Sequence, residues 1–203
     1  TFKKFWLLHS IEEPTIEGNR FIVRRTKNGD TGMLQNHVLL PEAGNAQIEK
    51  VGGKGKEFWV FGTNYPNDAL PNRPDDANKR GAWRVEVSPA APATEDCFLN
   101  VMQVADNTCK RMHDVKRIDA EKVVGVQIAD RVVTFSRDSR PLSGKVDMKV
   151  DGNTAMKFVI TDLIPGTWQI KKDGKVYIPA MEVRSDDGIL SFEGTAGHYE
   201  FLR

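Results

Sequence analysis

The segment GAWRVEVSPAAPATEDCFLNVMQVA, from Gly81 to Ala105, decides the fold of this chain. Every second residue from Trp83 to Val87 is apolar, and Arg84 and Glu86 lie between them. This period of two is typical of a strand with one buried and one solvated face. A Pro/Ala-rich connection separates it from a second extended apolar run. Two such strands in succession predict an all-β, antiparallel architecture.

Similar β-rich runs bounded by turn residues recur about every ten residues, as in a sandwich or barrel. Together they predict strands at Lys4–Ser10, Arg20–Arg25, Gly32–Leu40, Ala46–Val51, Glu57–Gly62, Ala82–Ser88, Cys97–Val104, Lys122–Ile128, Arg131–Arg137, Gly144–Val150, Ala155–Thr161, Thr167–Lys172, Lys175–Ile178, Ala180–Ser185, Ile189–Glu193 and His198–Leu202.

Four dipeptides between these runs supply residues that tolerate the positive φ of tight hairpin turns: Asn28-Gly29, Asp151-Gly152, Asp173-Gly174 and Asp187-Gly188. We therefore predict a meandering antiparallel β-sandwich. The four tryptophans, Trp6, Trp59, Trp83 and Trp168, all lie in strand patterns, where a ring usually packs in the core.

Length and charge limit the function. The 203 residues are 39% hydrophobic and 28% charged, enough for one large or two small domains. Lys plus Arg total 29 against 28 Asp plus Glu, so the net charge of +1 provides no bulk field for nucleic acid or an anionic membrane. No apolar run is long enough for a membrane span. Because the chain begins with Thr1, we expect a processed or excised piece.

A break from Asp106 to Asp114 is the predicted domain boundary, which gives a sandwich at 1–112 and a second at 113–203. A single extended sandwich is the alternative. Cys97 and Cys109 could form a disulfide across this region in an exported protein, worth about 3 kcal/mol by loop entropy. Two unpaired thiols are the other interpretation, because free cysteines are often buried.

The polar segment from Thr63 to Arg80 is predicted to be a long loop, and long loops often carry function. Its Tyr65, Arg73 and Arg80 are candidate glycan contacts, with the ring as a stacking platform and the guanidinium groups for acidic sugars. A solvated loop with Tyr65 packed on its own prolines is the alternative.

The sequence does not match the other motifs that would indicate metal binding, phosphate binding or catalysis. The histidines His9, His37, His113 and His198 lack metal-ligand spacing, and no residues match a calcium loop or nucleophile elbow. Gly52 to Lys56, GGKGK, lacks the spacing of a phosphate-binding loop and is interpreted as a hairpin connection. We predict no metal, no cofactor and no catalytic residue.

Several segments resemble polysaccharide lyases of the heparinase II/III type. They are KKFWLLHSIEEPTIEGN from Lys3, KVGGKGKEFWVFGTNYP from Lys50, and the opening stretch, which together cover roughly residues 3 to 105. Agreement is weaker in VVGVQIADRVVTFSR from Val123. The tail, with TDLIPGTWQIKKDGK and GHYEF, is similar to the terminal strands of many carbohydrate-active enzymes.

The resemblance implies the C-terminal β-sandwich region of a secreted or periplasmic bacterial lyase, which performs β-elimination on uronic-acid-containing glycosaminoglycan such as heparan sulfate. The catalytic residues of that family come mainly from an upstream helical toroid, and none can be placed on this chain. The implied partners are the N-terminal helical catalytic domain, an acidic polysaccharide, and, as an open question, a second copy in a homodimer. A stand-alone carbohydrate-binding module and a purely structural module are the alternatives.

Overall fold

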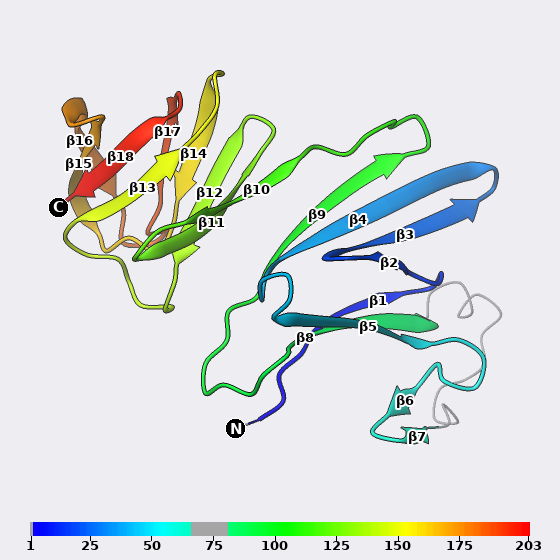
Figure 1. The fold of residues 1–203 in the computed structure, drawn as a ribbon. Helices are drawn as coiled ribbons and strands as arrows, with labels where there is room; N and C mark the ends of the chain where they lie inside the picture. The colour runs from blue at the N-terminus through cyan, green and yellow to red at the C-terminus, as the bar shows by residue number, and fades with distance from the viewer. Residues whose placement is uncertain (1, 66–80) are drawn as a thin grey trace. The chain divides into compact units, whose positions relative to one another are not determined.

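The structure is a computed structural model that describes residues 2–65 and 81–203. The described residues form strands and turns without an α-helix, which confirms the predicted all-β fold (Figure 1). The chain divides into two compact units, Thr1–Met112 and His113–Arg203. Each unit is built mainly of two facing sheets.

In the first unit, one sheet has three antiparallel strands in the order β1-β8-β5, and the other has four in the order β2-β3-β4-β9. A short hairpin, β6-β7, lies on the side of the three-stranded sheet away from the four-stranded one (Figure 1). The bounds are β1 (Trp6–Ser10), β2 (Thr15–Glu17), β3 (Arg20–Lys27), β4 (Asp30–Leu40), β5 (Ala46–Gly52), β6 (Trp59–Val60), β7 (Thr63–Asn64), β8 (Trp83–Pro89) and β9 (Leu99–Asp106).

The core of the first unit lies between its two sheets. Phe21 and Val38 project from the four-stranded sheet, and Val85 and Val87 project from β8, all without exposed surface. The predicted core positions on β8 are thereby confirmed for the two valines. Trp83 is half-buried nearer the end of the strand, where the Lys50 Nζ lies 5.8 Å from its ring centroid.

In the second unit, a five-stranded sheet has the order β10-β11-β12-β14-β17 and a four-stranded sheet the order β13-β18-β15-β16. The pair β12-β14 is parallel because the intervening β13 belongs to the opposite sheet. The bounds are β10 (Val115–Asp119), β11 (Val123–Ile128), β12 (Arg131–Ser136), β13 (Val146–Val150), β14 (Met156–Ile160), β15 (Gly166–Lys172), β16 (Lys175–Val183), β17 (Leu190–Gly194) and β18 (Gly197–Leu202).

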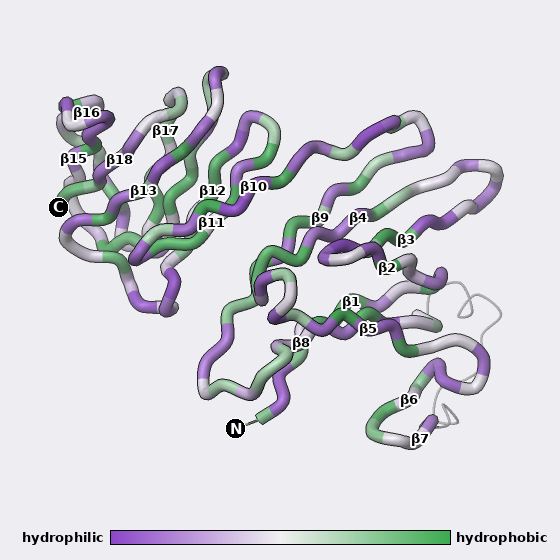
Figure 2. Tube along the Cα trace, in the orientation of Figure 1, coloured by the Kyte–Doolittle hydropathy of each residue, from purple (hydrophilic) through white to green (hydrophobic). Residues whose placement is uncertain are grey.

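The second core is large and aromatic. Trp168, Tyr199, Phe158 and Phe201 are fully buried, and the rings of Phe158 and Phe192 stack at 4.8 Å between centroids. The polar groups of Trp168 and Tyr199 are both hydrogen-bonded. The Trp168 Nε1 donates to the Ile164 carbonyl at 3.0 Å, and the Tyr199 hydroxyl donates to the Thr195 carbonyl at 2.6 Å. Along most strands hydrophobic and hydrophilic residues alternate, as each sandwich face requires (Figure 2).

Turn chemistry explains two of the hairpins. Asn28-Gly29, between β3 and β4, has φ angles of 55° and 90°, and Asp173-Gly174, between β15 and β16, has 50° and 77°. Two consecutive positive φ values define the type I′ turn, whose twist matches that of antiparallel strands.

The strand predictions were wrong in four places. Glu57–Gly62 is not one strand, because the chain reverses at Phe61-Gly62 and forms the β6-β7 hairpin. The two runs divided by Pro179 are one strand, β16, which tolerates the proline because it lies at a sheet edge with a register shift. The short strands β2 and β10 were missed.

Candidate functional site

A groove of about 550 Å³ lies in the first unit, on the face of the β1-β8-β5 sheet that points away from the core. Its floor is formed by outward-facing side chains of the three strands, and its wall by the β6-β7 hairpin. We call it the outer-face groove. Its lining includes His9, Glu49, Trp59, Phe61, Arg84 and Glu86.

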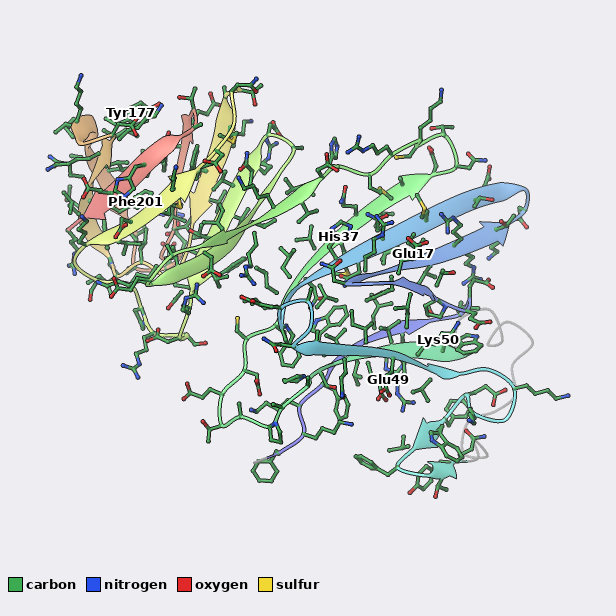
Figure 3. All side chains as sticks on the ribbon, in the orientation of Figure 1. Glu17, His37, Glu49, Lys50, Tyr177 and Phe201 are labelled. Atoms are coloured by element: carbon green, nitrogen blue, oxygen red, sulfur yellow. The ribbon has the colours of Figure 1, made fainter. Side chains whose placement is uncertain are left out.

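Strand register gathers the polar floor. Glu86 lies directly opposite Glu49 on β5, and Arg84 lies directly opposite His9 on β1. In Figure 3 the labelled Glu49 and Lys50 point to opposite sides of β5, as consecutive strand residues do. Alternation thus places one charged set on the groove face and leaves the valines of β8 in the core.

An ion pair organises this floor. The Arg84 Nε and Nη2 atoms each lie 2.7 Å from the Glu86 Oε1, and both side chains are largely buried. Such a two-pronged, charge-assisted contact fixes the guanidinium plane. Glu49 and His9 are exposed, and neither side chain has a hydrogen-bond partner within residues 2–65 and 81–203.

The wall is the hairpin that follows the GGKGK turn. The Phe58 N–H donates to the Asn64 Oδ1 at 2.9 Å and the Tyr65 N–H donates to the Phe58 carbonyl at 3.3 Å, so the two arms are held together. Trp59, predicted to be a core residue, is instead half-buried and lines the groove, with the Lys56 Nζ 5.4 Å from its ring centroid.

Phe61 occupies the turn of this hairpin. Its φ is 46° and that of Gly62 is 92°, and the Phe61 side chain is 95% exposed. A left-handed φ is rare for a bulky residue, and Asn, Asp or Gly normally takes this turn position. At Phe61, which lies at the groove rim, both the backbone conformation and the exposure of the ring to solvent are therefore unfavourable. Residues with such rare backbone conformations cluster at functional sites.

Of the three predicted glycan contacts, the structure describes only Tyr65. Tyr65 follows β7 with an exposed ring, but it is not among the residues that line the outer-face groove. Arg73 and Arg80 lie outside the described residues. Sequence reasoning assigned Arg84 and Glu86 to the solvated face of a strand and missed His9 and Glu49. The sequence indicated these four residues only through alternation in three separate strands. It does not reveal which strands are neighbours in the sheet.

The two cysteines are free thiols in the structure, with Cys97 exposed. The Cys109 Sγ donates to the Arg111 carbonyl at 3.3 Å instead of bonding to Cys97. The described residues contain no cluster of three or more His, Cys, Asp or Glu side chains able to hold a metal ion. They also contain no helix of the length and hydrophobicity that crossing a membrane requires.

A smaller cavity of about 350 Å³ lies in the second unit, lined by Lys122, Arg137, Arg140 and neighbouring residues. Its cations are engaged within the protein: Lys122 donates to the Lys145 carbonyl at 2.8 Å, and Arg137 contacts Asp119 and the Ala120 carbonyl. The outer-face groove, with Glu49 and His9 open, is the better candidate for binding.

Comparison with known families gives a match within the second unit. Residues 117–203 match the family model of the heparinase II C-terminal domain, and no curated protein matches the chain. The matched range begins within β10 and contains every later strand of that unit. This part of the chain is therefore a heparinase II/III-like C-terminal region, related to polysaccharide lyases. The match contains the segment 123–137 but none of residues 3–105, which carry most of the motifs that resemble the lyases.

Proposed function

We propose that the chain is the non-catalytic β-sandwich portion of a secreted or periplasmic bacterial polysaccharide lyase. The enzyme would act by β-elimination on uronic-acid-containing glycosaminoglycan, such as heparin or heparan sulfate. The match of residues 117–203 to the heparinase II C-terminal domain carries this proposal. In it the chain supports an N-terminal helical domain of the same protein that binds and cleaves the acidic polysaccharide.

The two tyrosines of the second unit support a non-catalytic role for that unit. Elimination beside a uronate carboxylate needs a base, an acid for the leaving oxygen and a group that neutralises the carboxylate. The Tyr177 hydroxyl donates to the Glu193 carbonyl at 2.8 Å and that of Tyr199 to the Thr195 carbonyl. Burial raises the pKa of Tyr199 to about 12, which opposes the phenolate that a tyrosine base would require. Both hydroxyls therefore act in packing.

The closed core of the second unit supports a platform role. Its buried side chains fill the space between both sheets, and its polar rings are internally satisfied. Such a unit can hold a neighbouring domain without rearranging its own core.

The test uses the parent protein and this chain separately. Residues 1–203 incubated with heparan sulfate should give no rise in the absorbance of unsaturated uronate, while the parent protein should give one. A shortened parent protein that ends before Thr1 should lose activity, and addition of purified residues 1–203 should restore part of that activity. Turnover by residues 1–203 alone, or full activity of the truncated parent, would refute the proposal.

A stand-alone carbohydrate-binding module is the second candidate, and the outer-face groove is the observation that favours it. The coding sequence upstream of Thr1 separates the two. Several hundred helix-rich residues containing Tyr, His and Arg would favour the lyase, and a short leader would favour the independent module.

A further inference from the structure

We propose that the outer-face groove binds an uncharged pyranose unit through its hydroxyl groups. The proposal concerns a binding site in the first unit and does not depend on the lyase assignment, which comes from the second. It rests on three observations: the polar floor, the aromatic wall and the balance of charge in the lining.

The floor offers acceptors and donors in a fixed arrangement. The Glu86 Oε1 receives both Arg84 contacts, which leaves its second oxygen and the Glu49 carboxylate as acceptors without a partner among the described residues. Carboxylates accept strong hydrogen bonds from hydroxyl groups, and a guanidinium has five N–H donors to share. Neighbouring sugar hydroxyls, which both donate and accept, match this combination.

The wall offers an apolar surface for the other face of a sugar ring. Trp59 lines the groove, and Phe61 stands at its rim with a nearly fully exposed ring. Small-ligand sites typically combine such aromatic surface with a few placed polar groups in a volume of about 300–1,000 Å³. The C–H groups of a pyranose can pack on the rings while its hydroxyls reach the floor.

The charge of the lining gives an acidic sugar no net attraction. Glu49 and Glu86 lie directly opposite each other, and Arg84 is paired with Glu86. Lys3, the other Lys or Arg among the described lining residues, lies 4.8 Å from the Phe5 ring centroid. Two carboxylates and two cations leave the lining without net charge, so it does not recruit a sulfate or uronate carboxylate. The ligand is therefore an uncharged sugar.

The backbone of Phe61 provides a variant that separates binding from folding. Asn is favoured at its left-handed position, so Phe61→Asn should leave the urea unfolding midpoint unchanged or raise it. If the phenyl ring binds sugar, the same variant should weaken sugar binding about tenfold or more. A purely structural role of the ring would instead lower the unfolding midpoint.

The experiment is an amide NMR titration of residues 1–203 with cellobiose, lactose and N,N′-diacetylchitobiose, with a sulfated heparin disaccharide as the acidic probe. At least one uncharged disaccharide should shift the amides of Glu49, Phe61 and Arg84, more strongly than the heparin disaccharide does. Glu49→Gln should weaken that binding about tenfold. Phe2→Ala removes another exposed phenyl, which is 87% exposed and outside the groove, and should have no effect.

Any of four results would overturn the proposal. The first is the absence of groove shifts with all three uncharged disaccharides. The second is tighter binding of the heparin disaccharide. The third is a Phe61→Asn variant with wild-type affinity. If the groove amides shift only when the upstream domain of the parent protein is added, the groove is a protein-docking surface and the sugar assignment is wrong.

Discussion

The two units of this chain are sandwiches whose buried hydrophobic cores differ in size. In the second unit the buried cluster extends through both sheets and includes five aromatic side chains, Phe158, Trp168, Phe192, Tyr199 and Phe201. In the described part of the first, four residues form the buried cluster, Phe21, Val38, Val85 and Val87, with half-buried side chains around them. The described first unit has the smaller core and the larger open groove.

The inner face of β9 shows why the first core is smaller. The residues of β9 that pair with inward-facing positions of β4 include Met102 and Val104, and both are exposed. The opposite sheet has three strands against four, so it does not extend over β9. Apolar surface left open in this way adds nothing to folding, because the hydrophobic contribution scales with the area removed from water. We therefore expect the second unit to be the more stable of the two.

The largest expected effect is that of Trp168→Ala. Truncating this fully buried ring removes its packing and leaves a cavity, and it also removes the donor to the Ile164 carbonyl. The second unit should lose about 3–5 kcal/mol. Hydrogen exchange measured by mass spectrometry should accelerate in peptides from 113–203 and remain unchanged in those from 1–112.

Trp6→Ala is the matched control, because Trp6 is half-buried against the core of the first unit. It should accelerate exchange in the first unit alone. Equal acceleration of both units by either variant would contradict the division, because it would show that the two sandwiches unfold together.

The second effect is an alkaline loss of stability confined to the second unit. Burial, followed by the nearby Tyr177, raises the pKa of Tyr199 from 10.0 to about 12. The folded state therefore holds this proton more tightly than the unfolded state. Its contribution to stability is complete below pH 10 and is lost as the pH rises from 10 towards 12.

Urea unfolding followed by exchange in the second unit, at pH values below and within this window, measures the loss. Tyr199→Phe removes the titrating group and should flatten the dependence on pH, although it also removes the hydrogen bond to Thr195. Parallel pH profiles for the wild type and this variant would show that Tyr199 is not the source.

The strand pattern was predictable because it is local. Alternation placed Val85 and Val87 inside and Arg84 and Glu86 outside, and Val146, Met148 and Val150 are buried on β13 as a period of two requires. Local pattern also identified the type I′ turn at Asn28-Gly29, since these residues tolerate its dihedral angles. It failed at Phe61, where the turn residue is one that the conformation disfavours.

The groove could not be predicted because strand neighbours are not a local property. His9, Glu49 and Glu86 are far apart in the chain and meet only because β8 lies between β1 and β5. The family match shows a related limit. Strand alternation is common to all sandwiches, so the quoted motifs could not reveal that the match lies in residues 117–203.

The smallest effect concerns a polar residue inside the weaker core. Asn36 is fully buried on β4, where its Nδ2 donates to the Asn100 Oδ1 at 2.9 Å. Within the described residues its own Oδ1 is buried without a hydrogen-bond partner. A buried unpaired acceptor is destabilising by about 1–3 kcal/mol, and an apolar group of similar size removes that penalty.

Asn36→Leu should therefore stabilise the first unit by about 1 kcal/mol, since the half-buried Asn100 can exchange its lost partner for water. Urea unfolding of the first unit, followed by exchange in peptides from 1–112, measures the change. Asn36→Ala is the control, because it removes the same polar group but leaves a void, and it should be less stable than Asn36→Leu. Stabilisation by Asn36→Leu would reduce the difference in stability between the two units and attribute part of that difference to one unpaired oxygen. Destabilisation of more than about 1 kcal/mol would show that this oxygen is hydrogen-bonded, and the difference between the units would then rest on apolar packing alone.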